Sequence, residues 1–200
     1  MAAQGSFTGD AGGEIFWQSW PAPEGEAARG VVVIAHGVSE HSDRYAHVAR
    51  RLNGAGYDVF ALDHRGHGRS EGGGANIGRI ASAAADIGTV IAIARERSSG
   101  PKLFLLGHSM GGALALEFAL DHEEQLDGLV LSASAAALEA ASRFELVAGR
   151  VLSVVAPGLG VFPVDPTSVS RDPAVVSDYE SDPLNYHRKL PARTVAELAG

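Results

Sequence analysis

The residue whose surroundings most clearly suggest chemistry is the serine in the stretch GHSMGG, residues 107–112. The apolar run KLFLL comes directly before this stretch, and the helix-forming run GGALALEFALDH overlaps its end. A Gly-x-Ser-x-Gly pattern between a strand and a helix is typical of a nucleophile elbow, a tight turn that exposes a serine hydroxyl above a sheet. The pattern predicts that Ser109 is the nucleophile of a hydrolase; the alternative is a glycine-rich turn with an incidental serine.

A nucleophilic serine needs donors that stabilise the oxyanion of a tetrahedral intermediate. The helix after the elbow directs its first amides, beginning with Met110, towards the site. A second donor is expected from HGVSEHSDRY, residues 36–45, which follows the apolar run VVVIA. We expect the amides of Val38 and Met110 to form the oxyanion hole; the alternative for residues 36–45 is an ordinary loop between a strand and a helix.

Histidine and acidic residues cluster twice, but neither cluster has the spacing of a metal site. In HGVSEH the spacing is one residue longer than in zinc-binding H-x-x-E-H, and the segment follows a strand instead of lying on a helix. The second cluster, DHRGHG at residues 63–68, contains two glycines that favour a loop. No G-x-G-x-x-G follows the first strand of a crossover unit. We therefore expect neither a metal nor another cofactor.

The elements that must position these residues alternate between apolar strands and helices. Strands are expected at EIFWQSW and at residues 31–36, 58–63, 102–107 and 128–134, and helices at about 43–54, 80–97 and 110–122. Their near-continuous apolar character suits strands that are buried on both faces. This alternation predicts an α/β fold with a mostly parallel sheet and flanking helices.

The pattern changes from about residue 135. A helical stretch is followed there by a Pro- and Gly-rich stretch and then by short helices and turns, and no further buried strand is expected. We therefore divide the chain into a core at residues 1–134 and a lid at residues 135–200. The lid contains apolar residues that could line an acyl-chain tunnel, rest on a lipid surface or pack on the core: Phe144, Leu146, Val147, Val151, Leu152, Val154 and Val155.

The composition narrows the class of protein. Of the 200 residues, 46% are hydrophobic, and the formal net charge of −8 argues against a nucleic-acid partner. The absence of cysteine excludes disulfides and a thiol nucleophile. We see no signal peptide at the start and no uninterrupted apolar run long enough for a membrane span. The expected location is cytoplasmic or peripheral to a membrane, and the oligomeric state stays open.

With the elbow, the loop HGVSEHSDRY and the stretch YDVFALDHRGHGRSEG considered together, the sequence resembles the α/β-hydrolase superfamily. The likeness is to its branch of monoacylglycerol lipases and lysophospholipases, especially the actinobacterial ones, and it extends to SRDP and YESDPL in the lid. The resemblance implies that Ser109 attacks an ester carbonyl to form an acyl-enzyme. It implies that Glu40, Arg44, His108 and Tyr179 line a polar pocket for a glycerol head. Asp63 and His64 match a structural loop and receive no catalytic role.

The same resemblance implies a triad whose acid and histidine follow strands beyond the lid, and both positions are absent from these 200 residues. None of the four histidines considered as substitutes is a promising general base: His36, His108, His122 and His187. We therefore expect a truncated form, with residues 128–134 as a long apolar edge strand. Two functions stay open: a serine hydrolase of monoacylglycerols or related lipid esters, and a catalytically dead lipid-binding or vestigial hydrolase fragment.

Overall fold

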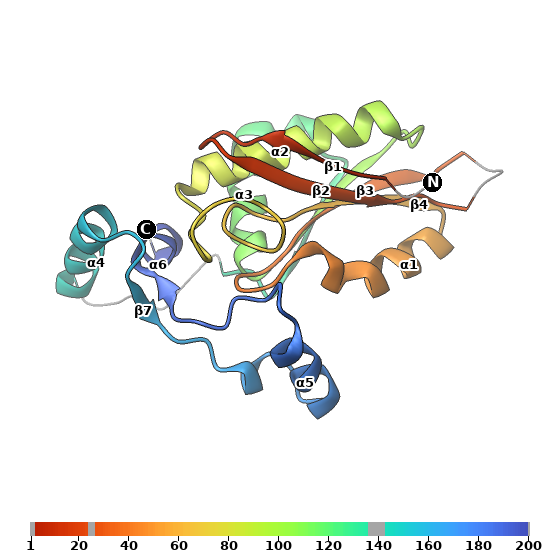
Figure 1. Cartoon of the computed structure of the whole chain (residues 1–200). Coiled ribbons are helices and arrows are strands. Elements are labelled where there is room, and N and C mark those ends of the chain that lie inside the picture. Colours follow the sequence, from red (N-terminus) through yellow and green to blue (C-terminus); the bar gives the residue numbers. More distant parts are fainter. Residues whose placement is uncertain (1–2, 24–26, 136–142, 200) are drawn as a thin grey trace.

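A computed structural model describes residues 3–23, 27–135 and 143–199 of the chain. Its centre is a six-stranded sheet in the order β1-β2-β4-β3-β5-β6 (Figure 1). The four strands from β3 to β6 are parallel, and the two N-terminal strands join them antiparallel. The strands are β1 Ala3–Thr8, β2 Glu14–Trp20, β3 Gly30–Ala35, β4 Tyr57–Leu62, β5 Leu103–His108 and β6 Gly128–Ser132. The predicted fold class, a mostly parallel α/β sheet with flanking helices, is confirmed.

Helices cover both faces of this sheet. In Figure 1, α2 (Ile80–Arg97) and α3 (Met110–His122) lie on one face and α1 (Ala46–Gly54) lies on the other. Strand β3 is buried throughout and divides its side chains between the two layers, because successive residues of a strand point to opposite faces. One set packs in the cluster that includes α2 and α3, and the other packs in the cluster that includes Tyr45 and Ala49.

The parallel register brings the ends of the central strands to one edge of the sheet. Ala35 at the end of β3 is paired with Leu62 on one side and with Gly107 on the other, and His108 is paired with Ser132. The loops that follow β3, β4, β5 and β6 therefore leave the sheet at the same edge. Ligands of open α/β sheets bind in the crevice outside the carboxyl ends of the strands, so this edge is where a site is expected.

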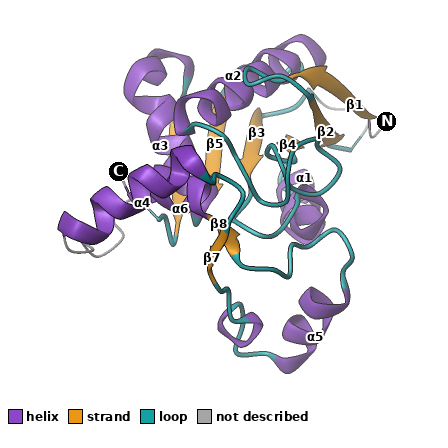
Figure 2. Ribbon diagram, turned by 60° about the vertical axis from the view of Figure 1, so that its left-hand side comes forward, coloured by secondary structure: helices purple, strands orange, loops and turns teal. Residues whose placement is uncertain are grey.

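Residues 143–199, here called the C-terminal segment, lie beside this edge (Figure 2). The segment contains α4 (Arg143–Val155), β7 (Gly160–Phe162), α5 (Pro173–Ser181), β8 (Leu190–Pro191) and α6 (Ala192–Ala199). Hydrogen bonds tie α6 to the start of α2 and to the loop before it. Thr194 Oγ1 donates to the Ala75 carbonyl at 2.6 Å, and the Ile80 amide donates to Glu197 at 2.8 Å. The segment is thus fastened to the sheet domain through polar contacts.

Three local expectations were wrong. Strand β1 was not predicted, because its sequence AQGSFT has no strong apolar alternation; its pairing with β2 stabilises it. The stretch expected as one helix at 43–54 begins with a 3₁₀ turn, Ser42–Tyr45. The expectation of no further buried strand fails at Leu190–Pro191, which is buried and pairs with β7. Residues 136–142 of the stretch expected to be helical lie outside the described residues.

Strand β6 is the outermost strand on one side of the sheet, an edge strand as the sequence predicts. Its side chains Val130 and Leu131 are 48% and 43% exposed, so an apolar surface faces outward there in the described part of the chain. Among the described residues, none of the helices combines the length and the apolar character that crossing a membrane requires.

Candidate active site

Ser109 stands at the turn between β5 and α3, in the conformation that a nucleophile elbow requires. Its backbone angles are φ 50° and ψ −116°, a region that residues with a side chain rarely occupy and that costs about 1–3 kcal/mol. Backbone hydrogen bonds hold this strained residue. The Ser109 amide donates to the Ser132 carbonyl at 2.9 Å, and the Ser109 carbonyl accepts from the amides of Ala135 and Gly112, each at 3.0 Å.

The glycines on both sides of Ser109 are required by close backbone contacts. A Cβ on Gly107 would lie 2.3 Å from the Gly111 carbonyl oxygen, and a Cβ on Gly111 would lie 2.1 Å from the Ala35 carbonyl oxygen. Helix α3 therefore starts against the end of β3, which only a residue without a side chain allows. This contact sets the Ser109 turn beside the loop that follows β3.

That loop, residues 36–45, contains the turn Gly37-Val38-Ser39, here called the oxyanion turn. A Cβ built on Gly37 would be 3.3 Å from the Ser109 Cβ, so the turn and the serine are direct neighbours. Ser39 is fully buried and has a positive φ of 64°, which marks a second strained position at the site. Within the described residues, the amides of Val38 and Met110 make no hydrogen bond, so both are available as donors.

A cavity of about 680 Å³ opens beside Ser109 between the sheet edge and the C-terminal segment. Its lining residues are Gly37, Val38, Glu40, Arg44, Tyr45, His47, Val48, His108, Ser109, Ala133, Val164, Ser168, Val169 and Tyr179. The lining combines an apolar part, with its valines, and a polar part. Such a cavity suits a small amphipathic ligand.

The polar part of the cavity is a connected set of side chains around Glu40. One oxygen of the Glu40 carboxylate accepts from the Tyr45 hydroxyl and from the Gly37 amide, both at 2.6 Å. The other oxygen accepts from Arg44 at 3.3 Å. The Arg44 guanidinium lies 5.1 Å from the centre of the Tyr179 ring, in a cation–π contact. Burial and the Glu40 carboxylate raise the pKa of Tyr45, which keeps its hydroxyl protonated as a donor.

Glu40 and Tyr179 are thus part of the scaffold as well as of the cavity wall. The bonds from Glu40 hold the oxyanion turn at Gly37. The Tyr179 hydroxyl donates to the Ser39 carbonyl at 3.3 Å, and the Tyr186 amide donates to the same carbonyl at 3.1 Å. Nearby, His41 Nε2 lies 2.8 Å from Asp182 of the C-terminal segment. The C-terminal segment therefore contacts the oxyanion turn directly.

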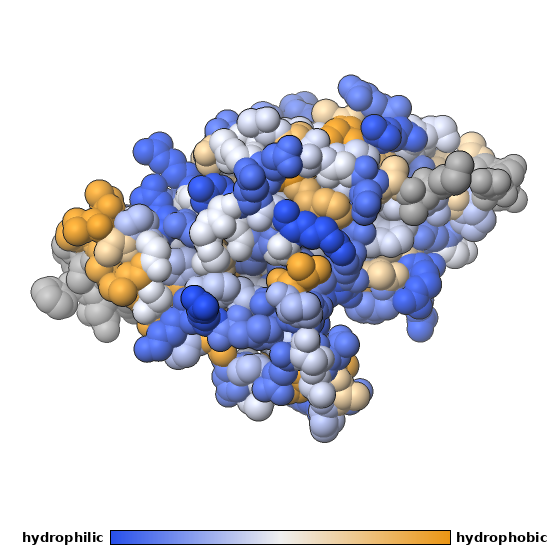
Figure 3. Space-filling view, viewed as in Figure 1, coloured by the Kyte–Doolittle hydropathy of each residue, from blue (hydrophilic) through white to orange (hydrophobic). Residues whose placement is uncertain are grey.

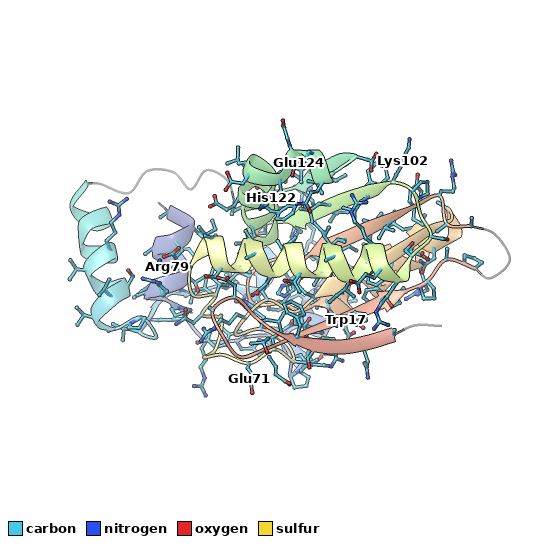
Figure 4. All side chains as sticks on the ribbon, turned by 90° about the horizontal axis from the view of Figure 1, so that it is seen from above. Trp17, Glu71, Arg79, Lys102, His122 and Glu124 are labelled. Atoms are coloured by element: carbon cyan, nitrogen blue, oxygen red, sulfur yellow. The ribbon has the colours of Figure 1, made fainter. Side chains whose placement is uncertain are left out.

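All eight histidines of the sequence lie in the described part of the chain, and no hydrogen bond joins any of their rings to Ser109 there. His108 lines the cavity, but its Nδ1 faces Ser132 Oγ at 3.1 Å. His36 is fully buried, and its two ring nitrogens bond the Gly37 carbonyl and the His64 amide. His187 Nε2 bonds the Asp182 carbonyl. His122 is exposed at the far end of α3, near Glu124 (Figure 4).

The loop after β4, residues 63–70, is hydrogen-bonded to the loop that follows β3, and it contributes no lining residue to the cavity. Asp63 is fully buried and accepts from the Ser42 amide and the Ser42 hydroxyl, at 2.8 and 2.6 Å, which anchors the start of the 3₁₀ turn. Burial lowers the pKa of the His67 imidazole to about 3 and that of His64 well below its ordinary value. Both rings are therefore neutral at physiological pH.

The structure brings six of the predicted site residues around one cavity: Val38, Glu40, Arg44, His108, Ser109 and Tyr179. Met110, predicted for its backbone amide, is fully buried at the start of α3. Sequence reasoning missed Tyr45, although it belongs to the quoted stretch HGVSEHSDRY. Its place in that stretch, five residues after Glu40, was the available signal. The lining residues Val164, Ser168 and Val169 come from a loop-rich stretch whose sequence gave no signal.

Comparison with known proteins agrees with the fold. Residues 26–200 match the family Hydrolase_4, described as serine aminopeptidase, S33. The chain is 40% identical over 196 residues to a monoacylglycerol lipase of Mycolicibacterium smegmatis, covering 98% of this chain and 69% of that protein. It is 37% identical over 172 residues to human monoglyceride lipase, covering 85% of this chain and 56% of that protein.

A solved structure shows the same likeness. The monoacylglycerol lipase of Paleococcus ferrophilus superposes with a TM-score of 0.78 at 33% identity, and covers 93% of this chain and 70% of its own. The fold and the strained serine define the class as an α/β hydrolase. The chain belongs to the Hydrolase_4 family of this superfamily, and its relatives place it with the carboxylic ester hydrolases that resemble monoacylglycerol lipase.

The contact between α3 and β3 makes a prediction about Gly111. We expect Gly111→Ala to lower the melting temperature by about 5 °C or more, because its Cβ would overlap the Ala35 carbonyl oxygen. Thermal unfolding followed by circular dichroism measures the change. The matched control is Gly54→Ala, where a Cβ meets no atom within 4 Å and helix propensity favours alanine. An equal effect of the two substitutions would contradict the close contact.

Proposed function

We propose that this protein is a serine hydrolase of monoacylglycerols or related lipid esters that acts through an acyl-enzyme at Ser109. The single observation that carries the proposal is the strained Ser109 backbone beside a cavity with a polar and an apolar part. Ser109 Oγ would attack the ester carbonyl carbon, and the Val38 and Met110 amides would stabilise the oxyanion. Collapse of this intermediate would release the glycerol and leave the acyl group on Ser109. Water would then release the fatty acid.

The proposed reaction needs a general base for the Ser109 hydroxyl. Since no histidine ring bonds Ser109 in the described part of the chain, we place the triad acid and histidine outside residues 1–200. The chain spans 69% of the mycobacterial relative and 56% of the human one. We further propose that residues 1–134 are part of the hydrolase core and that residues 135–200 act as a lid over the site.

The first prediction from this proposed function concerns the nucleophile. In the whole protein, Ser109→Ala should abolish the release of fatty acid from monoacylglycerol and the labelling by a fluorophosphonate probe, because both need the Oγ atom. The control is Ser6→Ala, at an exposed position of strand β1, which should change neither readout. Binding of monoacylglycerol by a wild-type protein that neither hydrolyses it nor reacts with the probe would instead support the alternative, a lipid-binding hydrolase fragment without catalysis.

The second prediction concerns the glycerol head. We propose that Glu40, Arg44, His108 and Tyr179 bind its hydroxyl groups, and Arg44 is the charged donor among them. We expect Arg44→Met to raise KM for monoacylglycerol about tenfold, since a hydrogen bond from a charged group contributes about 1.5–3 kcal/mol.

A substrate without a glycerol head makes this prediction specific. Hydrolysis of p-nitrophenyl butyrate by Arg44→Met should keep a KM close to that of the wild type. Arg51→Met, at an exposed position of α1, serves as the control substitution. A similar rise in KM for both substrates would show that Arg44 shapes the cavity and does not recognise glycerol.

The third prediction concerns a lipid surface. The C-terminal segment exposes apolar side chains on α4 and on strand β7. The most exposed of them are Val154, with 73% of its surface exposed, and Val155, with 78%. Figure 3 shows this apolar surface at the α4 end of the molecule. We propose that it contacts lipid. Of the residues suggested from the sequence, the side chains of Phe144, Leu146 and Val147 lie outside the described ones.

Replacing both valines by aspartate, Val154→Asp with Val155→Asp, should weaken binding of the protein to phosphatidylcholine vesicles at least tenfold in a sedimentation assay, because two charges would enter the interface. Leu120→Asp, at a 73% exposed position of α3, provides a matched control outside the surface. Equal loss of binding in the control would indicate a contact that is not specific to the C-terminal segment.

A further inference from the structure

The hairpin of β1 and β2 lies alongside α2 (Figure 1), and one buried carboxyl group fastens it there. Residues 9–13, here called the hairpin turn, are closed by a bond from the Gly9 amide to the Gly13 carbonyl at 2.9 Å. The Asp10 amide of this turn donates to Asp86 Oδ1 of α2 at 2.8 Å. A Cβ built on Gly9 would lie only 3.1 Å from the same oxygen. The hairpin turn is therefore packed directly on the Asp86 carboxyl group.

The Asp86 carboxyl group is buried without a paired cation. Only 3% of the residue is exposed, and no ion pair joins it to a cation within the described residues. Its neighbours one turn away on α2, at positions 82, 83, 89 and 90, are uncharged. Two charges from other elements face it: the Asp10 carboxylate and Arg65, whose guanidinium bonds the Asn76 carbonyl at 3.0 Å. Because a buried carboxylate without a paired cation is costly, this position favours the neutral acid.

Burial raises the pKa of the Asp86 carboxyl to about 6, and the Asp10 carboxylate adds to this rise. The bond from the Asp10 amide and the charge of Arg65 oppose it. In solvent the same carboxyl would titrate near its ordinary value of about 4. The folded hairpin therefore binds the proton more tightly than the open one. The resulting stabilisation is complete below about pH 4 and is lost as the pH rises through about 6.

The hairpin turn also contacts the loop to which α6 is bonded. The Glu14 amide, next to the turn, donates to the Glu71 carboxylate at 2.9 Å. A Cβ built on Gly78 would lie 3.8 Å from the Ala11 Cβ, and the Gly78 carbonyl accepts from Arg193 of α6 at 3.3 Å. The hairpin turn therefore lies behind the loop that attaches the C-terminal segment to the sheet domain.

We propose that the Asp86 carboxyl group is a protonation-sensitive clip, which holds the hairpin turn on α2 more tightly in mildly acidic than in alkaline solution. The neutral acid still accepts the Asp10 amide through its carbonyl oxygen. Loss of the proton places an unpaired charge in the contact, opposite the Asp10 carboxylate. The clip goes beyond the proposed function and does not depend on it, because Asp86 takes no part in the cavity or at Ser109.

The test needs a readout of the hairpin alone. Global unfolding would mix the effect of Asp86 with that of His64 and His67, whose lowered pKa values change stability in the opposite direction with pH. Hydrogen exchange of the Gly9 and Asp10 amides reports local opening of the turn. In the whole protein, we expect their protection factors, corrected for intrinsic exchange, to fall about tenfold between pH 5 and pH 8.

Asp86→Asn separates the clip from a merely structural contact. Asparagine keeps an acceptor oxygen for the Asp10 amide but cannot ionise, so the protection of the two amides should stay constant between pH 5 and pH 8. The matched control, Asp121→Asn at an exposed position of α3, should retain the tenfold change of the wild type. The same pH dependence in wild type and Asp86→Asn, or weaker protection in Asp86→Asn than in wild type at pH 8, would overturn the proposal.

A second measurement applies to the wild type and requires no substitution in the hairpin contact. The ¹³C chemical shift of the Asp86 carboxyl carbon, followed by NMR from pH 3 to pH 8, gives its titration midpoint. A midpoint near pH 6 supports the clip. A midpoint at or below about pH 4, the ordinary range of an aspartate, shows that the contact does not retain the proton and overturns the proposal.

Discussion

The contact between the start of α3 and the end of β3 is the constraint on which the rest of the site depends. Gly111 packs against the Ala35 carbonyl with no room for a side chain, and this brings Ser109 next to the oxyanion turn. The strain at Ser109 is sustained because its amide and carbonyl are bonded to the backbone at residues 132 and 135. A parallel sheet supplies this arrangement naturally, since the carboxyl ends of its strands share one edge.

The oxyanion turn is held from two sides that come from different parts of the sequence. On the side of the sheet, His36 and Glu40 bond the two polar groups of Gly37. On the other side, Tyr179 and Tyr186 of the C-terminal segment donate to the Ser39 carbonyl. The positive φ of Ser39 thus has support from residues about 140 positions away in the chain. The geometry of the turn and the position of the C-terminal segment are therefore physically linked.

The titratable groups buried near the site are either hydrogen-bonded or neutral, and the charged side chains lie at the cavity. Asp63 is buried but fully bonded, while the imidazoles beneath the oxyanion turn are neutral because burial opposes their protonation. Charged side chains are placed at the cavity, where Glu40 and Arg44 face each other and are each 15% exposed. A polar ligand would meet these two groups and the Tyr179 ring, whereas an apolar chain would find the valines of the same cavity.

Much of the fold was predictable from local patterns. The runs around β3, β4 and β5 are apolar because both faces are buried, and α2 and α3 begin and end at the predicted residues. The elbow was predictable for a similar reason: its two glycines report a backbone contact that any side chain would break. Strand β1 was not predictable, since its sequence has no strong apolar alternation and its stability comes from pairing with the neighbouring strand β2. The short pair β7–β8 was not predictable, since it joins residues about 30 positions apart.

The sequence by itself indicated the strand–turn–helix at Ser109 and the alternation of the central strands and helices, because both depend on interactions between residues close in the chain. Only the tertiary structure decided how Glu40 divides its oxygens between Gly37, Tyr45 and Arg44, and that Tyr179 supports the oxyanion turn. It alone revealed the orientation of His36 towards the Gly37 carbonyl. These features depend on side-chain directions and on contacts between distant segments, and no local pattern of residue types encodes them.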